Sequence, residues 1–141
     1  MSRITVGIDG SEHSLRALRW GLEEARLRDA TLEVLHAAVQ PEMPAYPVVM
    51  AVQSQEELTE AGKQLVEDAL SQVDTAGLEV VRTVEVGSSA TLLCGASREA
   101  DLLVVGARGL GGFRGLLLGS VTQQVIAHAA CPVVVVVPEG R

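Results

Sequence analysis

The stretch from Val104 to Val125 reads VVGARGLGGFRGLLLGSVTQQV and joins two different structural patterns through a glycine-dense loop. It begins as the end of an apolar run and ends in a helical pattern, which predicts a strand followed by a helix. Between the two lie six glycines and two arginines, with no acidic residue and no lysine. Because the whole chain carries a net charge of −7, a purely cationic loop at this place needs a local explanation.

The composition is that of one globular domain covering residues 1–141. Hydrophobic residues make up 48% of the chain and charged residues 21%. The acidic balance argues against a nucleic-acid or anionic-membrane partner. No secretory signal pattern opens the sequence, and no apolar run approaches the roughly 20 residues that cross a bilayer. We therefore expect a soluble, cytoplasmic protein.

Strand and helix patterns alternate along the chain. Short runs rich in β-branched and aliphatic residues predict five strands, at Ile4–Asp9, Thr31–Val39, Leu78–Val86, Asp101–Gly106 and Pro132–Pro138. Apolar residues at helical spacing predict a helix between each strand and the next. This order predicts right-handed crossovers and a single doubly wound, five-stranded parallel sheet of the α/β class.

The second and fourth helices carry definite expectations about which side chains face inward. The second is predicted from about Ser54 to Thr75, with Gly77 as its stop. Its expected core residues are Leu58, Ala61, Leu65, Ala69 and Val73. The fourth is expected to run from Ser120 to Ala130, with Val121, Val125 and Ala129 on its inner face. Cys94 and Cys131 lack metal-ligand spacing, so we expect buried free thiols.

The chemistry-bearing residues gather at one predicted edge of the sheet. If the strand order is 3-2-1-4-5, the first and fourth strands are neighbours, and parallel sheets bind ligands beyond the carboxyl ends of such strands. The first strand ends in Gly7-Ile8-Asp9-Gly10-Ser11 and the fourth in the glycine loop. Their ends are therefore predicted to form one crevice.

The glycine loop has the properties of a phosphate site. Its glycines allow a ligand to approach the backbone closely. Gly119 and Ser120 fall at the start of the last helix, where unpaired N–H groups and the helix dipole favour an anion. Hydroxyl groups are added by Ser120 and Thr122, and positive charge by Arg108 and Arg114. A locally bound phosphate would explain why the cationic loop occurs in an acidic chain.

Other interpretations of the loop stay open at this point. Glycine-rich loops also occur as simple connections, and Ser120 could serve only as a helix cap. The loop lacks the lysine of a Walker A motif, and Arg114 stands where a dinucleotide-binding GxGxxG would need its third glycine.

The spacing Gly106-x2-Gly109-x9-Gly119-Ser120 resembles the ATP-binding signature of universal stress proteins, G-x2-G-x9-G-[ST]. IDGSEHS after the first strand, LEVLHA in the second, and the run from LLVVGARG to PVVVVV are similar to the same family. The similarity covers essentially the whole chain and is weakest in the proline segment and the second helix. It implies a Rossmann-type, adenine nucleotide alpha-hydrolase-like fold and the ATP-binding branch of the family.

The resemblance implies a nucleotide-responsive stress regulator, a binding protein more than an enzyme. It implies that Asp9 contacts the nucleotide and that the backbone at Ala37 receives the adenine. The phosphates would be surrounded by Gly106, Gly109, Gly119 and Ser120, with Val121 and Thr122 beside them and Gly7 before the Asp9 turn. Arg108 occupies a variable position of the signature, so its role as a phosphate contact rests on its charge alone.

The expected cofactors are ATP and Mg²⁺. The phosphate oxygens would coordinate the ion, with Asp9 as an indirect contact. No catalytic residue is predicted, because the loop has no lysine and no general base is placed near the γ-phosphate. We expect at most slow, incidental ATP hydrolysis. The alternatives are a slow ATP hydrolase and a binder of another adenine nucleotide such as cyclic AMP.

The last strand is the candidate dimer interface. Family resemblance implies a homodimer formed through it, and the five valines Val133, Val134, Val135, Val136 and Val137 support this independently. An uncharged strand at the edge of a sheet invites pairing with another chain, in a closed two-fold contact. The alternative is a last strand covered by helices on both faces, which would also explain the valines.

Overall fold

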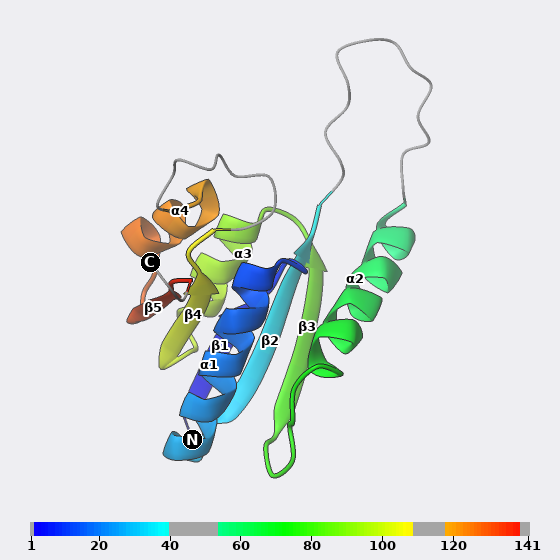
Figure 1. The fold of residues 1–141 in the computed structure, drawn as a ribbon. Helices are drawn as coiled ribbons and strands as arrows, with labels where there is room; N and C mark the ends of the chain where they lie inside the picture. Colours follow the sequence, from blue (N-terminus) through cyan, green and yellow to red (C-terminus); the bar gives the residue numbers. More distant parts are fainter. Residues whose placement is uncertain (1, 40–53, 109–117, 139–141) are drawn as a thin grey trace.

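The computed structural model describes residues 2–39, 54–108 and 118–138, so Gly109 and Arg114 of the glycine loop lie outside the described residues. Within these ranges the chain forms β1 (Arg3–Gly7), α1 (Glu12–Arg28), β2 (Thr31–Ala38), α2 (Gln55–Leu70), β3 (Val80–Val86), α3 (Ser89–Ala96), β4 (Leu102–Gly106), α4 (Ser120–His128) and β5 (Val133–Val136). All strand pairs are parallel, and the order is β3-β2-β1-β4-β5. The predicted fold class and strand order are confirmed (Figure 1).

Helices cover both faces of the sheet and enclose a core on each side. One core joins α1 and α2 to even-numbered strand residues such as Ile4, Val34 and Val104. The other joins α3 and α4 to odd-numbered residues such as Leu35 and Leu103. Strands covered on both faces read as continuous apolar runs, and every residue of β4 is buried accordingly.

Helix α2 is shorter than predicted, and one of its five predicted core residues faces outward. It ends at Leu70, and Gly77 lies in the turn before β3 with φ +79°. The prediction for Ala61 was wrong, because Ala61 is exposed and its neighbour Gly62 is buried. A Cβ atom at Gly62 would lie 2.6 Å from Val84 Cγ1. The missing side chain lets α2 approach β3, and this close approach sets which face of the helix turns inward.

Helix α4 also differs from its sequence-based description. Thr122 is 4% exposed, whereas Val121 is 37% exposed, so the hydroxyl-bearing residue occupies the inner face together with Val125. The helix ends at His128 instead of Ala130. Cys94 and Cys131 are free, as predicted, but the expectation that they are buried was wrong, because both are only partly buried.

The β5 strand lies at one edge of the sheet, as predicted, and its four residues are half-buried. Val134 and Val136 pack against the α1 side of the core, and Val133 and Val135 against the α3 side. Val137, just beyond the strand, is 51% exposed. In the described part of the chain, no helix is both long enough and apolar enough to span a bilayer.

Candidate functional site

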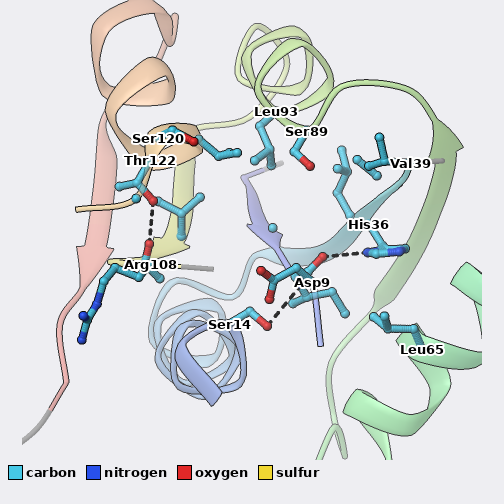
Figure 2. Close-up of a pocket in the computed structure, with 18 residues that line it drawn as sticks. Asp9, Ser14, His36, Val39, Leu65, Ser89, Leu93, Arg108, Ser120 and Thr122 are labelled. Carbon is cyan, nitrogen blue, oxygen red and sulfur yellow. Dashed lines mark hydrogen bonds between the residues drawn. The ribbon is translucent and has the colours of Figure 1, made fainter. Parts of the chain in front are cut away.

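A cavity of about 510 Å³ opens at the carboxyl edge of the sheet, between the ends of β1, β2 and β4 and the first turns of α3 and α4. Figure 2 shows the side chains that surround it. The predicted ligand-binding residues within the described ranges all line this one cavity, namely Gly7, Asp9, Ala37, Gly106, Arg108, Gly119, Ser120, Val121 and Thr122. The remaining predicted residue, Gly109, lies outside the described residues.

The Asp9 turn is fixed by local hydrogen bonds. The Ser11 amide donates to Asp9 Oδ1 at 2.9 Å, and the Asp9 amide donates to Ser14 Oγ at 3.2 Å. Ser11 is also the N-cap of α1, because its hydroxyl oxygen accepts from the Ser14 amide. Gly10 sits in this turn with φ +87°, a conformation that glycine adopts without strain. The turn thereby holds the Asp9 carboxyl group at the cavity.

His36, which the sequence places near the binding edge, holds the end of β1 through a hydrogen bond. His36 Nδ1 lies 2.9 Å from the Ile8 carbonyl oxygen (Figure 2). Because a carbonyl oxygen can only accept, Nδ1 carries the proton and donates this bond. The paired register of β1 and β2 ends at Gly7 and Leu35, two residues before Ala37. The Ala37 backbone therefore extends beyond the ladder, where it lines the cavity.

The start of α4 differs from the starts of the other helices. Serine caps α1, α2 and α3, and each serine side chain accepts from the backbone amide three residues later. Helix α4 begins at Gly119, where no side chain caps it. Its first helical hydrogen bond runs from the Gln123 amide to the Gly119 carbonyl at 3.0 Å. The amides of residues 120–122 thus precede that bond and lie at the cavity, as an anion site requires.

Two of the predicted residues are engaged in holding the fold. The Thr122 hydroxyl donates to the Gly106 carbonyl at 2.8 Å, which ties α4 to β4. A Cβ atom at Gly106 would lie 2.7 Å from the His13 carbonyl oxygen, so the close approach of α1 requires glycine there. At Gly7 a Cβ atom would meet only the end of the Leu93 side chain, at 2.8 Å, which can move aside. Gly106 thus allows packing and lines the cavity at once.

The ionisable side chains along the described lining are Asp9, His36 and Arg108. Arg108 lines the cavity near its α4 end, and in Figure 2 its guanidinium group points away from Asp9. No group of three or more His, Cys, Asp or Glu side chains suited to a metal ion occurs among the residues that the structure describes.

The apolar part of the lining comes from residues that sequence reasoning did not assign to the site. Leu65 reaches the cavity from α2, Leu93 from α3, and Val39 from the end of β2. Their signal in the sequence was weak, because an apolar residue at helical spacing predicts the core just as well. Only the strand order and the place where α2 crosses the sheet bring them to this edge.

Comparison with known proteins agrees with this architecture. The family model of the universal stress protein family matches residues 1–137. A universal stress protein of Mycolicibacterium smegmatis is 39% identical over 140 residues, which cover 94% of this chain and 47% of that protein. The chain thus spans about half the length of this relative.

Two solved structures are similar along nearly their whole length. A universal stress protein in complex with cAMP is 29% identical, with a TM-score of 0.68 and coverage of 96% of this chain and 95% of that one. The universal stress protein from Archaeoglobus fulgidus in complex with dAMP is 26% identical, with a TM-score of 0.69 and coverage of 96% and 97%. From the family match over residues 1–137 and these likenesses, we conclude that the chain belongs to the universal stress protein family.

Proposed function

We propose that this chain binds ATP in the cavity at the carboxyl edge of its sheet and acts as a nucleotide-responsive regulator. The observation that carries the proposal is the start of α4, the one helix of the described chain that begins on glycine without a side-chain cap. It opens into a cavity whose other end is apolar. A nucleotide has the matching form, with an anionic end and a flat, largely apolar base.

The phosphates would lie against the first turn of α4. The backbone amides of residues 120–122 and the Ser120 hydroxyl are donors at the cavity, and the helix dipole favours negative charge there. The Arg108 side chain would add positive charge by turning toward the bound phosphates. Mg²⁺ would be held chiefly by the phosphate oxygens, with the Asp9 carboxyl group as its contact on the protein.

The adenine would lie at the opposite end, beside the backbone of Ala37. Apolar side chains from several elements form the walls there, among them Ile8, Leu35, Val39 and Leu65. A cavity of about 510 Å³ falls within the roughly 300–1,000 Å³ of small-molecule sites. Complexes of related universal stress proteins with cAMP and dAMP support an adenine nucleotide as the ligand.

Binding without efficient catalysis is the activity that we propose. Of the ionisable side chains along the described lining, His36 already donates its Nδ1 proton to Ile8, and Asp9 is fixed in its turn by the Ser11 amide. The His36 ring also packs against Gly62 of α2, and we propose that both side chains serve the structure of the site rather than activation of a water molecule. Regulation would follow if partner proteins distinguish the nucleotide-bound from the nucleotide-free state. A homodimer through the β5 edge is part of the same proposal.

A second candidate ligand is cyclic AMP, favoured by the related structure that contains it. Calorimetric titration of nucleotide-free protein with ATP, AMP, cyclic AMP and GTP, each with and without Mg²⁺, separates the candidates. We expect ATP to bind with the highest affinity, because its triphosphate makes the most contacts with α4. Higher affinity for cyclic AMP than for ATP would favour the second candidate, and no binding of any adenine nucleotide would refute both.

A further inference from the structure

We propose that His36 is a positioning residue that keeps the backbone of Ala37 open for a base, and that it thereby sets a preference for adenine over guanine. The inference rests on the proposed function, because it concerns the same cavity. It starts from one hydrogen bond at the point where β1 and β2 part.

The hydrogen-bond pattern fixes which way the backbone of Ala37 points. On β2, the Leu32 amide donates to the Glu79 carbonyl, and the Ala38 carbonyl accepts from the Gly87 amide. The backbone N–H and C=O groups of even-numbered β2 residues therefore point toward β3. The Leu35 carbonyl accepts from the Ile8 amide, so odd-numbered residues face β1. Ala37 is odd-numbered, and its amide and carbonyl therefore point to the β1 side, beyond the last paired residues.

One further step of the ladder would join the Ala37 amide to the Ile8 carbonyl. In the structure this carbonyl oxygen accepts from His36 Nδ1 at 2.9 Å instead. The histidine side chain thus replaces a backbone donor. It holds the end of β1 beside β2 while the Ala37 amide stays available at the cavity.

Packing against α2 holds the imidazole ring in this position. A Cβ atom at Gly62 would lie 3.1 Å from His36 Cδ2 and 3.7 Å from its Nε2, so the ring packs directly against the helix backbone. Val84, the register partner of His36 on β3, lies on the other side of this position, since the same Cβ atom would be 2.6 Å from Val84 Cγ1. The absence of a side chain at Gly62 is what leaves room for the ring.

The open backbone offers a donor and an acceptor side by side. Adenine presents an acceptor at N1 and a donor at its 6-amino group, so both can pair with the amide and carbonyl of one residue. Guanine presents a donor at N1 and an acceptor at O6, which reverses both positions. A site that hydrogen-bonds its ligand discriminates against analogues that leave its polar groups unpaired. Keeping Ala37 out of the ladder would therefore select adenine.

The test compares ATP with GTP on the parent protein and two variants. His36→Asn places an amide nitrogen at the position of Nδ1 and keeps the donor, whereas His36→Leu removes it. We expect His36→Leu to weaken ATP binding by about tenfold, the equivalent of one net hydrogen bond, and to bring the ATP-to-GTP affinity ratio toward one. His36→Asn should restore most of the ratio. A ratio in His36→Leu equal to that of the parent would overturn the inference while leaving ATP binding intact.

A second measurement, made without nucleotide, does not depend on binding affinity. Amide hydrogen exchange of the nucleotide-free parent should show Ala37 exchanging much faster than Leu35, because only Leu35 lies within the ladder. In His36→Leu the Ile8 carbonyl loses its side-chain donor, and the Ala37 amide should become protected. Equal protection of Ala37 and Leu35 in the parent would overturn the inference by itself. If the parent binds no adenine nucleotide, the proposed function and the adenine preference both fail.

Discussion

At Gly106 a methyl group would lie 2.7 Å from the carbonyl oxygen of His13, so this glycine is required by the packing of α1 on β4. The Gly106 carbonyl accepts a hydrogen bond from the Thr122 hydroxyl, and Gly106 also lines the cavity. A glycine in a binding signature can thus have a structural reason that does not involve the ligand. The two reasons are separable by experiment, because one affects folding and the other affects only binding.

The first prediction concerns this packing. Gly106→Ala should destabilise the protein by about 1–3 kcal/mol, as overpacking does when backbone must shift. Gly95→Ala is the matched control, since nothing lies within 4 Å of a Cβ atom there and the position is in α3. It should stabilise by up to about 1 kcal/mol through helix propensity. Urea unfolding of both variants measures the difference, and a neutral Gly106→Ala would contradict the packing argument.

The second prediction concerns the reactivity of Cys131. Partial burial and the nearby carboxylate of Asp101 raise the pKa of its thiol, although a backbone hydrogen bond from Leu103 opposes them. A raised pKa means less thiolate at neutral pH, and the thiolate is the nucleophile. In a Cys94→Ser background, alkylation of Cys131 by iodoacetamide at pH 7.5 should be slower than that of glutathione. Alkylation faster than that of glutathione would contradict the expected direction of the shift.

Helix α4 forms one wall of the cavity, and a side-chain hydrogen bond joins it to β4. The Thr122 hydroxyl, 4% exposed, connects it to the carbonyl end of β4. Sequence reasoning assigned Thr122 to the phosphates because of its hydroxyl group. In the structure that hydroxyl donates its hydrogen bond to the Gly106 carbonyl, so the groups of α4 that remain for a ligand are chiefly backbone amides.

The third prediction tests this anchor. Thr122→Val keeps the shape of the side chain but leaves the buried Gly106 carbonyl without its donor, which should cost about 1–3 kcal/mol of stability. Thr122→Ser keeps the hydroxyl and should cost less. Thermal unfolding of the two variants gives the comparison. A Thr122→Val variant as stable as Thr122→Ser would show that the hydrogen bond does not hold α4.

The sequence predicted the order of the helices and strands, but not every residue on the inner faces of the helices. Alternating strand and helix patterns sufficed for the parallel sheet, because crossover rules leave few arrangements. On the inner face of α2 the prediction was wrong at Ala61, because periodicity favours Ala61, whereas close packing on Val84 selects Gly62. Hydrogen bonding by His36 was expected from the sequence, but its partner, the Ile8 carbonyl, could not be predicted, since it depends on where β1 and β2 stop pairing.

For the molecule as a whole, the β5 edge determines the expected assembly. The amides of Leu103 and Ala107 donate to the carbonyls of Pro132 and Val136, so even-numbered residues of β5 face β4. Val133 and Val135 therefore direct their backbone groups outward, where a second copy could pair with them. An edge with unpaired backbone groups and no charged side chain is a template for such pairing.

The fourth prediction uses this alternation. Val135→Pro removes an outward-facing N–H, which a dimer through β5 would need, and leaves the ladder to β4 intact. We expect light scattering to show a dimer for the parent and a monomer for Val135→Pro. Val134→Pro, which breaks the inner ladder, should instead lower the thermal stability. A parent that is monomeric at micromolar concentration would refute the dimer.

If the uncapped start of α4 binds the phosphates of ATP, the substitution Gly119→Ser should separate ATP binding from helix stability. Serine at this position would cap the helix as it does in α1, α2 and α3, and the φ of −72° there suits any residue. We would measure ATP affinity by calorimetry together with thermal stability for the parent and this variant. We expect unchanged or higher thermal stability and ATP binding weakened about tenfold or more, because the new cap competes for an amide that a charged ligand uses. Micromolar ATP binding that is identical in both proteins would contradict it.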